Sequence, residues 1–393
     1  MIPLPLAKQS GLFQHNCAQS CEMYDACEGS VSAPCGCVRE PSKKRYECES
    51  CYIRCRERRS PGFSIEQQLL EGIGLSELRV DQSVSYRFPL FIPIGTRAAA
   101  SALPLAWAGV DARALFNEAK TKPVNLKPYL RGDRSIKNYL RLADTTVPIA
   151  VLNGQDWLLE GFWGMRRDDL WQALRKHHFA AVTAPTFSIT REDTGFPASH
   201  NVFMQRQHHK VVQEIQDHGL LAIPNIYWRD EDDIRRWQDW LGEQGNIQVV
   251  TRDFSLTKLF GFQRELDEFI SLLSGIGKPV HVLLAGVGSA NGPTALRKLS
   301  HIGCTASVLS SYPIQEAVIK GCELSISISG TLFSEQNLSI SREQLVFENI
   351  QVMERYLISE ASSLPIYQPL KHTLPNFERN TTVPSELLDQ AKS

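Results

Sequence analysis

Eight of the ten cysteines of this chain lie close together near its start, in spacings typical of metal sites. The spacings are C-x3-C-x5-C, then C-x-C, then C-x2-C-x3-C. The residues are Cys17, Cys21, Cys27, Cys35, Cys37, Cys48, Cys51 and Cys55. Four thiolates hold a structural zinc ion in tetrahedral geometry, and four also hold a cubane iron–sulfur cluster. The segment therefore predicts bound zinc, with a 4Fe-4S cluster as the alternative, and His15 could replace one thiolate.

This cysteine segment is expected to be structural, because a metal site with every ligand from protein leaves no open position for a substrate. Disulfides are the competing interpretation, but the start of the chain lacks the features of a secretory signal. We therefore expect a cytoplasmic protein, in which thiols stay reduced and bind metal. No apolar run reaches the roughly 18 residues that span a bilayer, so no membrane partner is expected.

The cysteine segment ends in a basic stretch that could contact nucleic acid. Positions 39–59 hold eight Lys or Arg against four Asp or Glu. The candidate phosphate contacts are Lys43, Lys44, Arg45, Arg54, Arg56, Arg58 and Arg59. Such cations bind phosphates whatever the base sequence, although they can also form the solvated rim of a small metal domain. The formal charge of the whole chain is -1, which indicates no partner by itself.

Beyond the cysteine segment, apolar runs alternate with longer amphipathic segments, which indicates parallel strands joined by helices. Strands are expected at 86–95, 147–152, 180–187, 220–228, 247–251, 281–288 and 304–310. Helices are expected at 167–177, 202–218, 231–244, 262–275, 293–301, 314–320 and 341–357, and an Ala-rich stretch at 98–116 is expected to be helical. The fold class is therefore α/β, a (β/α)8 TIM-barrel-like domain that follows a small N-terminal Cys-rich domain. A doubly wound open sheet is the alternative, but no glycine-rich dinucleotide fingerprint follows the first strand.

Three parts of the chain are predicted from these patterns. Residues 1–60 form the Cys-rich metal-binding domain, residues 61–358 the barrel domain, and residues 359–393 a polar C-terminal tail. The tail contains prolines and lacks apolar periodicity, so we expect it to be loosely held. In a barrel, side chains at the carboxyl ends of the strands build the active site.

Two stretches resemble the tRNA-guanine transglycosylases, including the branches that modify archaeal tRNA and DNA. One is "PVHVLLAGVGSANGPTALRKLSHIGCTASVLSSYPIQEAVIKG" (279–321), which has a G-x-G turn after a strand and then a helix and a strand. The other is "FPLFIPIGT" (88–96), which is similar to the first barrel strand of that family. The resemblance covers about residues 86–321 and implies a barrel that exchanges guanine for a 7-deazaguanine in a nucleic acid.

The resemblance implies one aspartate as a general acid/base and a second as the nucleophile. The counterpart of the first is Asp156, with Glu160 one helical turn later, whereas the expected nucleophile position falls on Val308. Valine cannot attack a sugar. The relocated candidate is Asp253, which directly follows the run "IQVVT" at the rim of the predicted barrel, although an aspartate there can also be a helix cap.

Several further residues are candidates for substrate binding, because loops after barrel strands carry ligands. Ser188, Asn201 and Arg206 follow the strand predicted at 180–187 and could hold a base or a phosphate. Trp228, at a strand end, is a candidate platform for base stacking. Gly286 and Gly288 free the backbone where a strand ends, so they could shape the pocket.

The leading hypothesis is a nucleic-acid-modifying enzyme, a pentosyltransferase that exchanges guanine for a 7-deazaguanine in tRNA or DNA. Two alternatives stay open. One is a nucleic-acid-binding or scaffold protein that kept the barrel and lost the chemistry, for which Val308 is the best support. The other is an iron–sulfur enzyme whose cluster does the chemistry. The choice of polymer and the oligomeric state do not follow from the residues.

Overall fold

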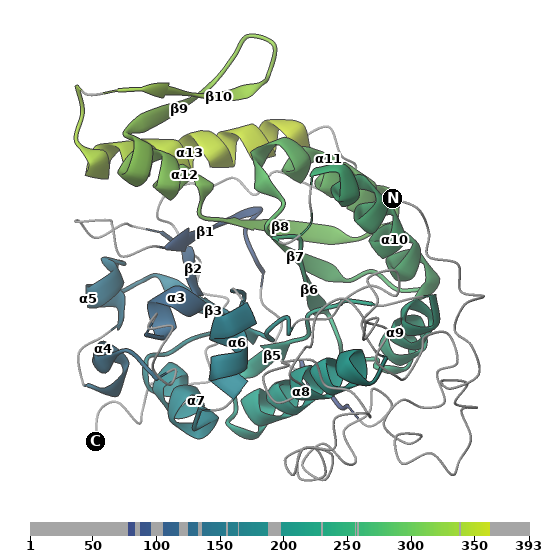
Figure 1. Cartoon of the computed structure of the whole chain (residues 1–393). Helices are drawn as coiled ribbons and strands as arrows, with labels where there is room; N and C mark the ends of the chain where they lie inside the picture. The colour runs from purple at the N-terminus through teal and green to yellow at the C-terminus, as the bar shows by residue number, and fades with distance from the viewer. Residues whose placement is uncertain are drawn as a thin grey trace, which may run out of the picture.

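The βα rhythm of the sequence folds into eight parallel strands surrounded by helices (Figure 1), as seen in a computed structural model. The structure describes residues 78–82, 87–95, 105–117, 125–132, 136–154, 156–163, 165–187, 198–228, 231–255, 257, 259–337 and 339–361. The cysteine segment and the predicted tail lie outside these residues. The α/β class and the barrel-like parallel sheet are therefore confirmed, and the N-terminal metal domain stays a prediction.

The strands run around the barrel in the order β5-β4-β3-β2-β1-β8-β7-β6, and every neighbouring pair in this order is parallel. They are β1 (Phe91–Gly95), β2 (Trp107–Asp111), β3 (Val147–Val151), β4 (Ala181–Thr183), β5 (Leu221–Ile223), β6 (Val249–Asp253), β7 (His281–Ala285) and β8 (Thr305–Ser310). This order leaves the carboxyl ends of all eight strands at one mouth.

Helices follow most of the strands and form the outer layer. They are α3 (Ala112–Leu115), α4 (Pro128–Arg131), α5 (Ile136–Leu140), α6 (Asp156–Trp163), α7 (Arg167–Lys176), α8 (Ala198–Asp217), α9 (Glu231–Glu243), α10 (Leu259–Gly275), α11 (Gly288–His301), α12 (Tyr312–Gln315), the π-helix η4 (Glu316–Lys320) and α13 (Arg342–Ala361). A hairpin of β9 (Cys322–Ile326) and β10 (Leu332–Gln336) lies along α13. Among the described helices, none is both long and apolar enough to cross a membrane.

The predicted helix at 98–116 is wrong over residues 107–111, which form β2, and right over Ala112–Leu115, which form α3. The sequence of β2, WAGVD, contains small residues and lies in an Ala-rich stretch, which is why the sequence predicts a helix there. The small residues are required by the barrel. A side chain on Gly109 would lie 3.1 Å from the Ile94 side chain on β1. This missed strand completes the eight.

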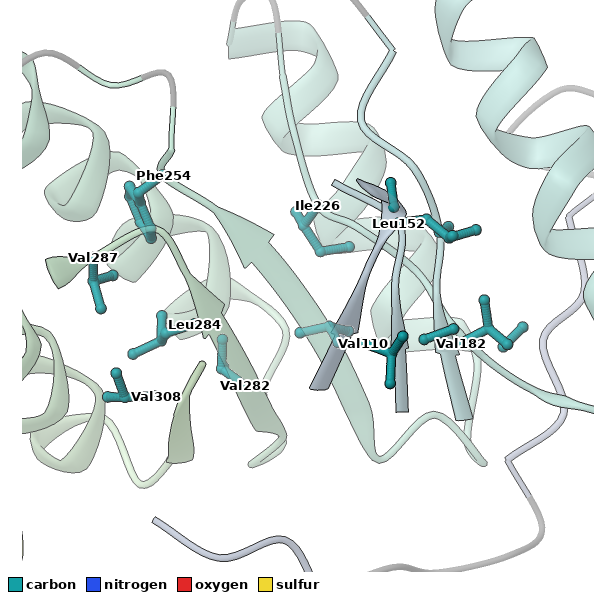
Figure 2. Packing of buried hydrophobic residues seen from close by; sticks show 14 of the residues in the cluster. Val110, Leu152, Val182, Ile226, Phe254, Val282, Leu284, Val287 and Val308 are labelled. Atoms are coloured by element: carbon teal, nitrogen blue, oxygen red, sulfur yellow. The ribbon is translucent and has the colours of Figure 1, made fainter. Parts of the chain in front are cut away.

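Two separate clusters of buried apolar residues show which way each strand residue faces. One cluster takes at least one side chain from every barrel strand and almost none from the helices, so it fills the barrel interior. Its strand members include Ile92, Ile94, Trp107, Ile149, Val151, Ala181, Ile223, Val249, Leu283 and Leu309. The other cluster combines the alternate strand residues with the helices, and Figure 2 shows part of it. Because successive side chains along a strand point to opposite faces, these clusters show which face each remaining strand residue occupies.

The barrel is nearly closed between β5 and β6, where an isolated bridge between Asn225 and Thr251 is supplemented by a glutamine. Toward the mouth, the amide of Ile226 donates to the carbonyl of Thr251 and the amide of Thr251 donates to the carbonyl of Pro224, both at 2.8 Å. At the opposite end, the buried Gln82 donates to the carbonyls of Ala222 (3.2 Å) and Val249 (2.8 Å). Its Oε1 accepts from the amides of residues 248 and 249 at 2.8 and 2.7 Å.

Replacing Gln82 with leucine is therefore expected to destabilise the barrel by about 3 kcal/mol, because it leaves buried amides and carbonyls of the seam without partners. Urea unfolding measures this cost. The matched control is Gln216→Leu, which removes two hydrogen bonds to the same segment from its exposed side and should cost less than about 1 kcal/mol. Equal costs for the two variants would mean that Gln82 does not close the seam.

A half-buried histidine lies at the end of the barrel opposite the mouth. The ring of His281 stacks on Phe88 at 5.3 Å between centroids, and its Nδ1 and Nε2 lie 2.8 and 2.9 Å from the hydroxyls of Thr305 and Ser307. The Ser307 hydroxyl donates its proton to the carbonyl of Pro89 at 2.5 Å. It must therefore accept from Nε2–H, and in the neutral ring Nδ1 accepts the proton of the Thr305 hydroxyl. Burial lowers the pKa of His281 from 6.5 to about 4.

This lowered pKa makes stability depend on pH. Below pH 6.5 the unfolded chain binds a proton at His281, but the folded chain does not until about pH 4. Stability should therefore fall as the pH drops from about 6.5 to about 4, by on the order of 3 kcal/mol for this group. The measurement is urea unfolding at several pH values, compared with His281→Asn. Parallel pH profiles for the two proteins would contradict the prediction.

Candidate functional site

The carboxylate of Asp253 faces the barrel interior at the mouth. Asp253 is the last residue of β6, and Val249 on the same face belongs to the interior cluster. Thr251, between them on that face, donates its hydroxyl proton to the carbonyl of Leu283 on β7. Alternation therefore places Asp253 over the interior, where it is partly exposed. Asp253 therefore lies at the rim of the barrel, where the sequence predicts it.

Two neighbouring groups hold this carboxylate. The backbone amide of Ser255 donates to Asp253 Oδ1 at 2.8 Å, which closes a tight turn after β6. The hydroxyl of Thr186, in the loop after β4, lies 3.4 Å from Asp253 Oδ2. The first hydrogen bond fixes the rotamer, and the longer second contact leaves Oδ2 the less engaged oxygen. The carboxylate is oriented rather than buried in an ion pair, as a nucleophile requires.

Gly286 makes the turn that holds Asp253 possible. Its backbone has φ +71, and a Cβ there would lie 2.3 Å from the Ser255 nitrogen, the atom whose N–H reaches Asp253. No other residue allows this approach of the two loops. Gly288, two residues on, also has a positive φ of +65, but a Cβ there would meet nothing within 4 Å. The two glycines that the sequence singled out therefore differ in what they do.

The opposite face of the same strand end is anchored to the helix layer. The guanidinium of Arg252 donates to Glu265 on α10 at 2.7 Å and to the carbonyl of Ile226 at 3.0 Å. Thr257 donates to the same Glu265 oxygen at 2.8 Å. Because this network holds the loop from both sides of β6, it limits how far Asp253 can move.

Trp228 lies in this outer network and not over the barrel interior. Its ring stacks on Phe269 of α10 with centroids 6.2 Å apart, and Arg252 lies over it at 4.3 Å. Its indole N–H donates to Glu268 at 2.8 Å, and the residue is 6% exposed. These contacts account for the tryptophan as a packing residue, so the stacking platform predicted for it has no support in the geometry.

Asn225 brings a buried amide to the mouth beside β6. It pairs with Thr251 across the seam, so it shares the interior-facing side of that residue. It is 2% exposed, and within the described part of the chain its Oδ1 has no hydrogen-bond partner. Its backbone amide donates to Nε2 of His208 on α8 at 3.1 Å. Burial lowers the pKa of His208 well below 6.5, so this ring stays a neutral acceptor that fixes the end of β5.

The remaining candidates lie at different depths of the fold. Asp156 is the first residue of α6, just beyond the mouth end of β3, but its side chain and that of Glu160 lie outside the described residues, as does Ser188. Arg206 and Asn201 are buried on α8, in the outer layer. The structure therefore brings Asp253 and Gly286 together at the mouth and leaves the pairing of Asp253 with Asp156 a prediction.

Val308 does not face the mouth. It belongs to the helix-facing cluster, where Figure 2 shows it with Leu284, and a Cβ on Gly292 of α11 would lie 3.8 Å from it. Its neighbour Leu309 is the residue that faces the interior. An aspartate at position 308 would point into the helix layer, so this position could not supply the nucleophile in the observed register.

Sequence reasoning missed four polar residues at the mouth. Thr186, Ser255 and Asn225 contact or flank Asp253, and Asp111 ends β2 on the interior face, beside Val151 of β3. Asp111 Oδ1 accepts from the amide of Ala114 at 2.9 Å and so caps α3. The available signal was the run Asp253-Phe-Ser, a pattern that favours a turn closed by the aspartate. Nothing in the sequence indicated the contact with Thr186.

The predicted metal ligands cannot be compared with this geometry, since Cys17–Cys55 lies outside the described residues. Within the part of the chain that the structure describes, no group of three or more His, Cys, Asp or Glu side chains could hold a metal ion. Zinc and the 4Fe-4S cluster both stay predictions for the cysteine segment.

Comparison with known proteins assigns no family. No protein-family model matches the chain, and no curated protein matches its sequence. The barrel and its mouth are therefore the observations from which a function can be proposed.

Proposed function

We propose that the chain is a nucleic-acid-modifying enzyme that replaces a guanine in tRNA or DNA with a 7-deazaguanine, and that Asp253 is its nucleophile. The observation that carries this proposal is the oriented carboxylate at the mouth, where Ser255 N–H holds Oδ1 and Oδ2 is less engaged. A barrel mouth is where this fold carries its catalytic groups.

The proposed exchange consists of two displacements at the sugar. The Asp253 carboxylate attacks C1′ of the target nucleoside, the glycosidic bond breaks, and guanine leaves with a proton from a general acid. The incoming 7-deazaguanine then attacks C1′, loses a proton to the same group and releases the carboxylate. Asp156, at the start of the helix after β3, is the proposed acid/base. The amide of Asn225, whose Oδ1 has no partner among the described residues, is the proposed hydrogen-bonding group for the base.

A covalent trap tests this function. The full-length protein is incubated with tRNA or with duplex DNA, together with a 7-deazaguanine, and resolved on a denaturing gel. We expect a protein–nucleic acid adduct with one polymer, and exchange of labelled guanine into that polymer. Absence of both adduct and exchange with both polymers would overturn the proposal and favour a binding protein that has lost the chemistry.

A further inference from the structure

A second polar region lies on the flank of the barrel, away from Asp253. It is formed by α4, by α5 with the turn after it, and by the end of α7, which lie side by side in Figure 1. The described residues of these segments, 125–132, 136–146 and 174–178, hold six Lys or Arg against one acidic residue, Asp144. We name five of these six cations the basic flank: Lys127, Arg131, Arg141, Arg175 and Lys176. Of these, Arg131, Arg141, Arg175 and Lys176 are exposed.

Specific contacts tie these segments into one surface. The rings of Tyr129 on α4 and Tyr139 on α5 stack with centroids 3.6 Å apart. At the end of α7, Lys176 donates to the carbonyl of Gly132, directly after α4, at 3.4 Å. The flank begins near the mouth, because the amide of Lys127 donates to the carbonyl of Leu115 in the helix that directly follows β2. From Lys127 the cations extend along the outside of the barrel toward its other end, since Arg141 lies six residues before β3 and Arg175 six residues before β4.

The backbone of this flank is left-handed at two positions where glycine would be less strained. Arg141 (φ 57) and His178 (φ 55) are the described non-glycine residues with a positive φ, and they lie after α5 and at the end of α7. Glycine is the usual residue in such positions, because any Cβ is strained there by roughly 1–2 kcal/mol. An exposed arginine at such a position, where glycine would be less strained, supports a role for its side chain.

The charge at helix ends explains only part of this pattern. Cations in the last turn of a helix stabilise its dipole, which accounts for Arg175 and Lys176 on α7. The helix dipole does not account for Arg141, which lies after the end of the five-residue helix α5. It also does not explain why the cationic segments of α4, α5 and α7 lie on one side of the barrel. Arginine forks match phosphate oxygens in pairs, and a row of exposed cations is the usual contact of a phosphodiester backbone.

We propose that the basic flank binds the phosphodiester backbone of the nucleic acid whose base enters the mouth. The inference rests on the proposed function for the identity of the polymer, but it concerns binding and not the chemistry at Asp253. It adds a contact surface in the described barrel to the cationic stretch of the cysteine segment.

The test measures binding of the full-length protein to fluorescently labelled tRNA and to a short DNA duplex over a series of salt concentrations. The variant Arg131→Gln/Arg141→Gln/Arg175→Gln should bind the preferred polymer about tenfold more weakly at low salt. Its slope of log affinity against log salt should fall by about two to three, since each lost phosphate contact removes close to one. The corresponding triple Arg→Lys variant keeps the charges and should retain the wild-type slope.

A matched control removes the same charge elsewhere. Arg235, Arg297 and Arg355 are exposed on α9, α11 and α13, and their triple Gln variant should bind within about twofold of the wild type. The single variant Arg141→Gly should bind more weakly while its melting temperature stays equal or rises, because glycine relieves the positive φ.

Three results would overturn the inference: a flank variant with the wild-type salt slope, a control variant with the same loss, or a wild-type protein that binds neither polymer. The Asp253→Asn variant separates this inference from the proposed function. It should bind like the wild type and yet carry out no exchange. If the flank variant has the wild-type slope of log affinity against log salt and exchanges guanine normally, the inference about the basic flank is wrong and the proposed function is unaffected.

Discussion

Replacing Asp253 with asparagine is expected to lower guanine exchange by about a thousandfold or more and to abolish the covalent adduct, because an amide cannot attack C1′. The fold should be unaffected. Asparagine has the same shape, and its Oδ1 can still accept from the Ser255 amide, which holds the aspartate at 2.8 Å. Exchange of labelled guanine under single-turnover conditions, with thermal unfolding measured in parallel, checks both parts of the prediction.

Asp111 supplies the matched control for this experiment. It is also the last residue of a barrel strand and faces the interior, but its Oδ1 caps α3. Asparagine is an equally good helix cap, so Asp111→Asn should keep its stability and lose less than about tenfold in exchange. If Asp111→Asn loses the adduct and Asp253→Asn keeps it, the nucleophile lies on β2 and the assignment to β6 is wrong.

The sequence predicted most of the barrel because each strand buries both of its faces. The runs that were recognised, such as those of β3, β7 and β8, are rich in β-branched and large apolar residues. β2 was missed because its Ala108 and Gly109 are small, and their size follows from the close approach of β1. Small residues are needed there only because β1 and β2 are neighbours in the barrel, so no local sequence pattern indicates a strand.

The site was predicted in part for a similar reason. Asp253 follows a run of alternating strand residues, so its place at the rim and its inward direction could be inferred from Val249 onward. Trp228 stands five residues beyond the end of β5, where alternation no longer applies, and its ring packs against α10. The Thr186 contact joins the loop after β4 to Asp253 at the end of β6, and the two residues are 67 positions apart in the chain. Such contacts depend on tertiary packing that a single sequence does not encode locally.

The largest stability effect is expected at Gly286. In Gly286→Ala the added Cβ would lie 2.3 Å from the Ser255 nitrogen, a backbone atom, so one of the two loops must move. The positive φ of +71 adds strain of its own. We expect a loss of about 3 kcal/mol or more in the free energy of unfolding, measured with urea. Because the Ser255 amide would move away from Asp253, guanine exchange should also fall, by about a hundredfold, in the fraction that remains folded.

Gly288→Ala separates backbone strain from the clash with Ser255. Its φ of +65 is nearly the same, but a Cβ there meets nothing within 4 Å. The cost in stability should therefore be only the strain, about 1 kcal/mol, with exchange within about twofold of the wild type. Equal losses of stability and exchange in the two variants would mean that the positive φ alone accounts for both effects. The close approach of Gly286 to Ser255 would then not hold Asp253. Unequal losses that extend to exchange would tie the proposed nucleophile to the turn after β7, because a Cβ on Gly286 would displace the Ser255 amide that holds Asp253.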